Sequence, residues 1–270
     1  MIGFFDSGFG GLTVLREVKK ILPQYSYVYL GDNARTPYGS RDGKTIYEFT
    51  AEGVRKLFEK GAELIILACN TSSSNALRQI QQEFLPAHFP EKKVLGIIIP
   101  TAEEIGRFTH TGEIGVLATE ATVASLVYPK EIAKTNPHIK VYAQACPLFV
   151  PAIEAGEVDS PVFDKLIEEY LGSLFSQSGQ IDAVLLGCTH YATIEGRIKN
   201  HLPQKVNLVS QGPIIAQKLE DYLSRHPEIE SKLEKRGSRL FLTTDGRKEV
   251  ETLSGMFYGE PITMETASFL

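Results

Sequence analysis

The sequence predicts an α/β protein built on parallel sheets, and two observations indicate this class. Short apolar runs alternate with helical patterns along the whole chain of 270 residues. A repeated order of strand, helix, strand, helix is typical of parallel sheets, whose crossovers carry helices. The run at residues 64–68 is also apolar without interruption, as is expected of a central strand that is covered on both faces. This length fits one large domain or two smaller ones.

The first series of elements starts at the N-terminus. Strands are predicted at residues 2–5, 27–30, 64–68 and 94–99, the last closed by Pro100. Amphipathic patterns predict helices at residues 12–21, 45–60 and 74–84, and Gly61 is placed to cap the second of these. These elements account for the first third of the chain.

A second series follows without a low-complexity linker. Strands are predicted at residues 114–117, 141–143 and 183–186, with helices at 123–135, 161–176 and 194–202. Two further runs, at residues 206–209 and 240–243, are expected to return to the first sheet. The predicted division therefore gives a first domain of residues 1–97 plus 207–270 and a second of residues 98–206.

Composition and charge exclude several classes of protein. The chain has 28 Lys and Arg against 33 Asp and Glu, a net charge of −5, and no basic run, which disfavours a dedicated nucleic-acid binder. No apolar stretch approaches the ~18 residues of a membrane span, and the N-terminus lacks the basic region of a signal peptide. Three cysteines are too few for a disulfide scaffold. We therefore expect a cytoplasmic protein without a membrane segment.

One internal similarity relates the two series. Residues 64–71 and 183–190 each read as a buried strand, a small residue, a cysteine and two polar residues, so that Cys69 and Cys188 lie 188 − 69 = 119 positions apart. Ligands of open parallel sheets bind outside the carboxyl ends of the strands. A helix that starts there favours a thiolate and binds anions. If the two halves face each other, the two thiols flank one ligand.

Inversion of a carbon that carries a proton needs such an arrangement, because one group removes the proton and another returns one to the opposite face. Asp6 at the end of the first strand and His190 after the second cysteine could assist the thiols. The alternatives are that the cysteines are small core residues and that Asp6 caps a turn. Cys146 lacks polar neighbours and is interpreted as structural. No Cys-x-x-Cys, His-Glu-x-x-His or Gly-x-Ser-x-Gly pattern indicates a metal site or a serine hydrolase.

The segment from Gly8 to Thr13 offers a competing interpretation. It follows a strand and opens a helix, and Asp32 ends the next strand, where a ribose-binding acid would stand. Thr13 occupies the third glycine position of that dinucleotide fingerprint, however, and no Walker lysine is present. A nucleotide-binding dehydrogenase therefore remains a minor alternative.

Over nearly its whole length the chain resembles the bacterial glutamate racemases of the aspartate/glutamate racemase superfamily, which use no cofactor. The resemblance is carried by motifs in the family's order and spacing: Phe5-Asp6-Ser7-Gly8, Gly31-Asp32-Asn33-Ala34-Arg35, Pro37-Tyr38-Gly39, Ala68-Cys69-Asn70-Thr71, Ala145-Cys146-Pro147 and Gly187-Cys188-Thr189-His190-Tyr191. It implies two similar α/β domains with the active site in the cleft between them. It also implies D-glutamate production for peptidoglycan synthesis and a homodimer.

The resemblance also implies roles for individual residues. Cys69 and Cys188 would be the two acid/base groups, assisted by Asp6 and His190, with Glu154 as a further candidate near the site. Substrate contacts are implied for Asp6, Cys69, Cys188 and His190 themselves and for Ser7, Pro37, Tyr38, Gly39, Asn70, Thr71, Thr119, Thr122 and Thr189.

The sequence departs from the family pattern at Ser72-Ser73, Thr101 and Ala192-Thr193, which affects loop shape but no acid/base residue. Two further functions remain open. One is racemisation of another acidic amino acid such as aspartate. The other is a non-enzymatic regulator, because some members of the family inhibit DNA gyrase. The resemblance implies no metal and no cofactor.

Overall fold

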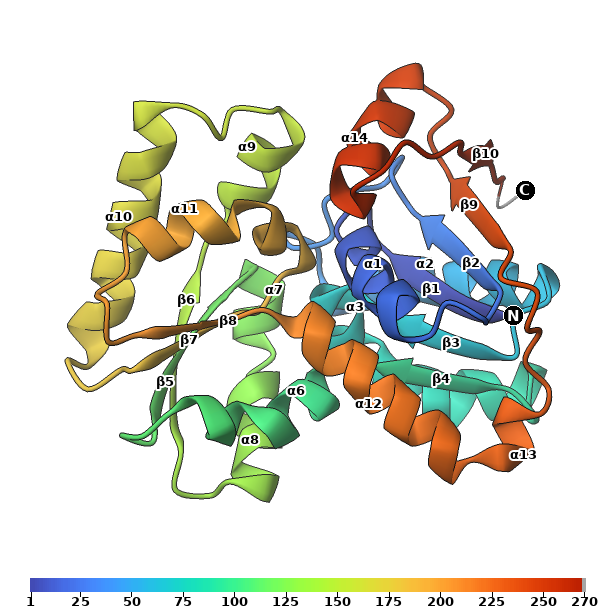
Figure 1. Ribbon diagram of the computed structural model, residues 1–270, viewed down its shortest axis with the longest axis horizontal. Helices are drawn as coiled ribbons and strands as arrows, with labels where there is room; N and C mark the ends of the chain where they lie inside the picture. Colours follow the sequence, from blue (N-terminus) through green and yellow to red (C-terminus); the bar gives the residue numbers. More distant parts are fainter. Residues whose placement is uncertain (269–270) are drawn as a thin grey trace.

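The computed structural model describes residues 1–268 and contains two parallel sheets that lie side by side (Figure 1). The first sheet has six strands in the order β10-β9-β2-β1-β3-β4, and the second has four in the order β6-β5-β7-β8. Every strand pair is parallel. The predicted fold class is therefore confirmed.

The strands of the first sheet are β1 (Ile2–Asp6), β2 (Tyr27–Gly31), β3 (Leu64–Leu67), β4 (Lys93–Gly96), β9 (Arg239–Thr243) and β10 (Glu265–Thr266). Those of the second are β5 (Glu113–Ala118), β6 (Lys140–Ala145), β7 (Ala183–Leu186) and β8 (Asn207–Val209).

The longer helices are α1 (Gly11–Ile21), α2 (Gly43–Glu59), α8 (Val127–Thr135), α10 (Pro161–Gln177), α12 (Gln211–Arg225) and α14 (Lys248–Tyr258). The shorter helices are α3 (Asn70–Asn75), α4 (Leu77–Gln79), η1 (Ile80–Phe84), α5 (Leu85–His88), α6 (Ile98–Glu104), η2 (Ile105–Phe108), α7 (Glu120–Ala124), α9 (Phe149–Glu154), η3 (Thr189–Ile194), α11 (Glu195–Asn200) and α13 (Pro227–Glu230).

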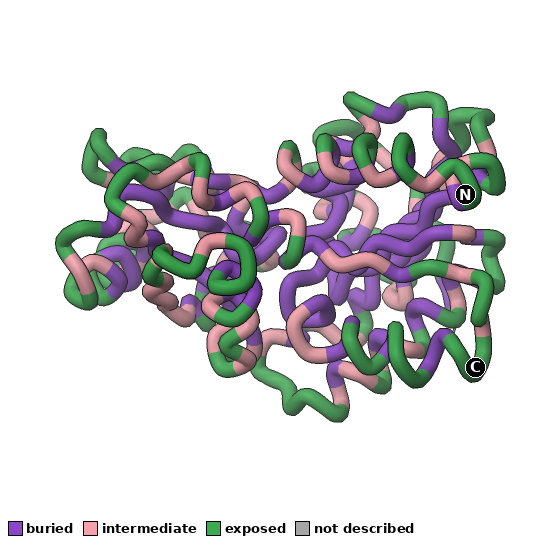
Figure 2. Tube along the Cα trace, turned by 90° about the horizontal axis from the view of Figure 1, so that it is seen from below, coloured by how far each residue is buried: buried purple, intermediate pink, exposed green. Residues whose placement is uncertain are grey.

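Helices cover both faces of the first sheet, because successive residues of a strand point to opposite sides. Phe4 packs in a cluster with Leu12 of α1, whereas Phe5 packs in another cluster with Val54 of α2. Both phenylalanines are fully buried. The buried backbone follows the strands, and exposed residues gather on the outer helices (Figure 2). The uninterrupted apolar runs in the sequence therefore mark central strands.

Two segments cross between the sheets. α6 leads from β4 of the first sheet toward β5 of the second, and α12 leads back after β8 (Figure 1). These two helices contact each other and α12 packs along α1. The carboxyl ends of β1, β3, β5 and β7 are followed by Ser7, Cys69, Thr119 and Cys188, which line one pocket.

The structure corrects several predicted elements. The strand at residues 206–209 does not return to the first sheet, because β8 pairs with β7 of the second. Strand β4 ends at Gly96 rather than residue 99, and Pro100 lies in the first turn of α6, where its missing N–H is tolerated. The predicted helix at 123–135 is divided at Leu126, whose φ is +55°. The strand at residues 240–243 does join the first sheet.

The remaining differences are one late helix start and several elements that were not predicted. The helix predicted at residues 74–84 begins earlier, at Asn70, directly after Cys69, which accepts a hydrogen bond as its N-cap. The polar run Asn-Thr-Ser-Ser-Ser hides the apolar period in this first turn. Helices α5, α6, η2, α9, α12, α13 and α14 and strand β10 were not predicted. Within residues 1–268, no helix is both long and apolar enough to cross a bilayer.

Candidate active site

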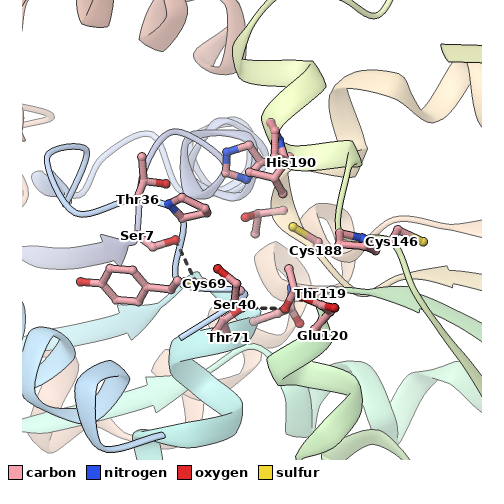
Figure 3. A pocket seen from close by; sticks show the side chains of 18 residues that line it. Ser7, Thr36, Ser40, Cys69, Thr71, Thr119, Glu120, Cys146, Cys188 and His190 are labelled. Atoms are coloured by element: carbon pink, nitrogen blue, oxygen red, sulfur yellow. Dashed lines mark hydrogen bonds between the residues drawn. The ribbon is translucent and has the colours of Figure 1, made fainter. Parts of the chain in front are cut away.

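A pocket of about 120 Å³ lies between the two sheets, where the carboxyl ends of their central strands meet. Cys69 and Ser7 lie on the side of the first sheet, and Cys188 and Cys146 on the side of the second (Figure 3). The lining consists of Ser7, Thr36, Pro37, Tyr38, Gly39, Ser40, Cys69, Asn70, Thr71, Thr119, Glu120, Cys146, Pro147, Val150, Pro151, Cys188, Thr189 and His190. No Lys or Arg of the described chain is among them.

Cys69 is held at the start of α3. Its Sγ lies 3.5 Å from the Ser72 backbone nitrogen and 3.4 Å from the Ser7 hydroxyl oxygen. Burial, and then the charge of Asp6, raise the pKa of the Cys69 thiol to about 11, against a smaller effect of these hydrogen bonds. In the absence of ligand at neutral pH, Cys69 is therefore a thiol, ready to donate a proton.

Asp6 joins the two halves of the site from behind. It is completely buried, accepts a hydrogen bond from the Gly8 N–H at 2.9 Å, and accepts another from the Thr189 hydroxyl at 3.3 Å. Burial raises its pKa, and the nearby His190 opposes this effect. Asp6 does not line the pocket, but it is hydrogen-bonded to the lining residue Thr189.

Cys188 stands beside an imidazole ring rather than a carboxylate. His190 Nε2 lies 2.9 Å from the Glu154 carboxylate, and His190 and Cys188 both line the pocket. Burial lowers the pKa of His190, but its partners Cys188 and Glu154 outweigh burial and raise that pKa to about 10. His190 is therefore an imidazolium at neutral pH, and a neighbouring imidazolium stabilises a thiolate. The surroundings of the two cysteines thus differ in charge.

Hydroxyl groups form the wall between the two cysteines. Thr71 Oγ1 lies 2.9 Å from Thr119 Oγ1, which in turn lies 3.0 Å from Thr122 Oγ1. Thr119 caps α7, so the backbone N–H groups of that helix start point toward this wall. Hydroxyl and backbone N–H groups bind carboxylates without a buried cation, and this wall therefore suits an acidic ligand.

Tyr38 lines the pocket with its ring, while its hydroxyl donates a hydrogen bond to the buried Asp32. Asp32 also accepts hydrogen bonds from Arg35 at 2.7 Å and from Thr244 at 2.8 Å. Asp32, which suggested a ribose-binding site, thus accepts hydrogen bonds from three side chains of the protein itself. It anchors the loop of residues 36–40 at the pocket.

The glycine-rich turn that contains Gly10 lets the segment after Cys188 pack closely against it. A Cβ atom on Gly10 would lie 2.2 Å from Thr189 Oγ1 and 2.6 Å from His190 Nδ1. The segment after Cys188 therefore occupies the space above this turn, where a dinucleotide fingerprint would hold a pyrophosphate. The dinucleotide interpretation is wrong for this structure.

The structure brings most of the predicted residues together. Ser7, Pro37, Tyr38, Gly39, Cys69, Asn70, Thr71, Thr119, Cys188, Thr189 and His190 line the pocket. Asp6, Thr122 and Glu154 stand behind it, each bonded to a lining residue.

The sequence analysis did not identify six lining residues: Thr36, Ser40, Glu120, Pro147, Val150 and Pro151. It interpreted Cys146 as structural, although Cys146 also lines the pocket. Their only sequence signal is that they lie within or next to the recognised motifs. Within residues 1–268, no group of three or more His, Cys, Asp and Glu side chains is placed to hold a metal ion.

Two opposed thiols in a pocket between parallel sheets are typical of one class of enzyme. Residues 12–219 match the Asp/Glu/Hydantoin racemase family, and the chain belongs to this family of racemases. It is 38% identical over 276 aligned positions to the glutamate racemase of Paracoccus denitrificans, covering 98% of this chain and 99% of that one.

Solved structures lead to the same group. A glutamate racemase of Bacillus anthracis superposes with a TM-score of 0.89 at 30% identity, covering 99% of this chain and 97% of that one. That of Francisella tularensis, solved with D-glutamate, gives 0.87 at 34% identity with the same coverage. Within its family this chain is therefore one of the glutamate racemases, as its motifs predicted.

Proposed function

We propose that the protein interconverts L- and D-glutamate by a two-base transfer of protons at the α-carbon, with Cys69 and Cys188 as the two bases. The observation that carries this proposal is the placement of two thiols, one from each sheet, on a single pocket. A thiol and a thiolate on opposite faces of one carbon are what inversion requires.

The reaction conserves protons. The thiolate of one cysteine takes the α-proton, and the electron pair of the broken C–H bond is delocalised into the α-carboxylate. The thiol of the other cysteine then gives its proton to the opposite face of the carbon. The first cysteine ends as a thiol and the second as a thiolate, so the reverse reaction starts from the product state.

The surroundings of the cysteines support a different resting role for each. Cys69, with its raised pKa, would hold its proton and act as the acid, and Cys188, beside the charged His190, would act as the base. Glu154 is a positioning residue that acts through His190. Asp6 supports Cys69 and orients Thr189.

Substrate binding follows from the donors of the pocket. Ser7, Asn70, Thr71, Thr119 and Thr189 would bind the two carboxylates of glutamate, and Thr122 would support Thr119. The loop with Pro37, Tyr38 and Gly39 would close one side. The Francisella tularensis structure with D-glutamate supports this class of ligand. Aligned dipoles in a closed pocket would stabilise the carbanion.

The same proposal extends to the cell. D-glutamate would enter peptidoglycan synthesis, in the cytoplasm, and the protein would act as a homodimer without a nucleic-acid partner, a metal or a cofactor. The protein would consist of two units. The first is residues 1–97 together with the chain after β8, and the second runs from residue 98 to the end of β8. The two units would close on the substrate by bending at α6 and α12, which cross between the sheets. This division keeps β8 with the second sheet.

Incubation with L-glutamate in D2O tests the proposal. We expect loss of optical rotation together with deuterium at the α-carbon, without added cofactor. Cys69→Ala and Cys188→Ala should each abolish racemisation. Cys146→Ala, which changes the third cysteine of the pocket lining, should not. Full activity in either of the first two variants contradicts the mechanism. Faster turnover of L-aspartate than of L-glutamate would contradict the substrate.

A further inference from the structure

Asn70 belongs to a closed network of polar side chains whose remaining members lie behind the pocket. Its other members are Thr101 of α6, Tyr128 of α8 and Gln211, the first residue of α12. Their exposed fractions are 2% for Asn70, 0% for Thr101, 2% for Tyr128 and 4% for Gln211. Only Asn70 is part of the pocket lining. The network joins the first turn after Cys69 to both segments that cross between the sheets.

The hydrogen bonds of this network have only one consistent direction. Thr101 Oγ1 lies 2.7 Å from the Ile97 carbonyl oxygen, and a carbonyl can only accept, so the Thr101 hydroxyl donates there. Thr101 can therefore only accept from Gln211, whose Nε2 lies 3.0 Å away. The NH2 group of Gln211 is thus fixed toward Thr101.

The orientation of Gln211 in turn determines the orientation of the Asn70 amide. With its nitrogen committed, Gln211 presents Oε1 to Asn70, which donates from Nδ2 at 2.6 Å. The hydroxyl of Tyr128 accepts from Gln211 Nε2 at 2.9 Å and donates to Asn70 Oδ1 at 2.5 Å. The carbonyl of Asn70 therefore faces Tyr128, and its NH2 group has one N–H left over.

We propose that Thr101, Gln211 and Tyr128 are positioning residues, which fix the side-chain amide of Asn70 so that it offers the pocket an N–H donor and never its carbonyl. A carboxylate substrate needs a donor at this wall, and a flipped amide would repel it. The proposal deepens the proposed function and rests on it for the acidic substrate. Thr101 stands where the sequence departs from the family pattern, so this chain sets its amide through a threonine.

A matched pair of variants at Thr101 tests the proposal. Thr101→Val keeps the shape but removes the hydroxyl, so Gln211 and Asn70 can both turn over. Thr101→Ser retains the hydroxyl. We expect Thr101→Val to raise KM for both enantiomers roughly tenfold, the cost of losing one hydrogen bond to a charged group, with kcat almost unchanged. Thr101→Ser should stay within about twofold of the parent.

Several results would overturn the proposal. These are a KM of Thr101→Val within about twofold of the parent, an equal effect of Thr101→Ser, or a fall in kcat with KM unchanged. Tyr128→Phe removes the donor to Asn70 Oδ1 and one acceptor of Gln211 Nε2, but leaves the bond from Gln211 to Thr101. It should raise KM in the same direction and serves if Thr101→Val does not fold. Thermal unfolding of each variant identifies a loss that is merely structural.

A second measurement is independent of turnover. In ¹⁵N-labelled protein, the side-chain amide of Asn70 should exchange its hydrogens slowly in the parent and in Thr101→Ser, and much faster in Thr101→Val. If the parent fails to racemise glutamate, the proposed function is wrong. The hydrogen exchange of the Asn70 amide then still tests whether the network fixes its orientation. Equal exchange in the parent and Thr101→Val would then overturn it.

Discussion

The carboxylate of Glu154 lies 2.9 Å from Nε2 of His190 and fixes the ring that stands beside Cys188. Glu154 is the last residue of α9, and His190 lies in η3 directly after β7. The bond therefore joins two segments that are 36 positions apart. It places a negative charge behind the imidazole and away from the pocket, where that charge raises the pKa of His190.

Glu154→Gln should move the alkaline fall of kcat/KM toward neutral pH. A neutral amide still hydrogen-bonds to the ring but no longer favours its charged form, so His190 loses its proton at a lower pH. Cys188 then loses its positively charged neighbour. The pH profile of racemisation is the measurement, with the exposed Glu157→Gln as control. An unchanged profile for Glu154→Gln would contradict this role of Glu154.

Cys69 should make the protein less stable in alkaline solution. Its pKa is near 9 in an unfolded chain and about 11 in the folded one. Between these values the unfolded thiol has lost its proton while the folded one keeps it, so the free energy of unfolding falls as the pH rises from about 9 to 11.

Urea unfolding at pH 8.5 and pH 10.5 checks this sign. The decrease should be smaller in Cys69→Ser by at most about 2 kcal/mol, which is less than the full two pKa units because the measured range ends below pH 11. Other groups that titrate in this range are common to both proteins and cancel in the comparison. Equal decreases would show that Cys69 is not held as a thiol.

Gly10→Ala should impair catalysis. Its methyl group would fall within 2.9 Å of Thr189 and His190 atoms, including the backbone nitrogen of His190, and would displace that segment. A shift of about 1 Å in a positioned group costs about 100-fold in rate. Gly43→Ala is a matched control, because its nearest neighbour would lie 3.8 Å away. Steady-state racemisation decides, and equal activity in both variants contradicts the prediction.

Tyr38→Phe should loosen the loop of residues 36–40. Asp32 keeps Arg35 and Thr244 but loses the phenol, while the pocket keeps the ring. One buried hydrogen bond contributes about 1–2 kcal/mol, so chemical denaturation should show a loss of that size. KM should rise with it. Tyr47→Phe, on α2, serves as the control, and a Tyr38→Phe variant as stable as the parent would count against this anchoring role.

The hydrophobic pattern was sufficient for the central strands of both sheets. It failed at β8, because a strand of three residues contains no signal for the sheet it joins, and pairing with β7 decided that. It also placed the start of α3 too late, because the polar residues of that turn face the pocket and a neighbouring helix rather than the core.

The sequence by itself determined the fold class, the two strand-end cysteines and the motif residues around them. These follow from local patterns, since apolar runs and fixed spacings are properties of short segments. Only the tertiary structure decided which groups stand beside each thiol. It paired Glu154 with His190, occupied Asp32 with Tyr38, and filled the space above Gly10 with Thr189. Contacts between distant segments depend on how the two sheets pack, and no local pattern records that packing.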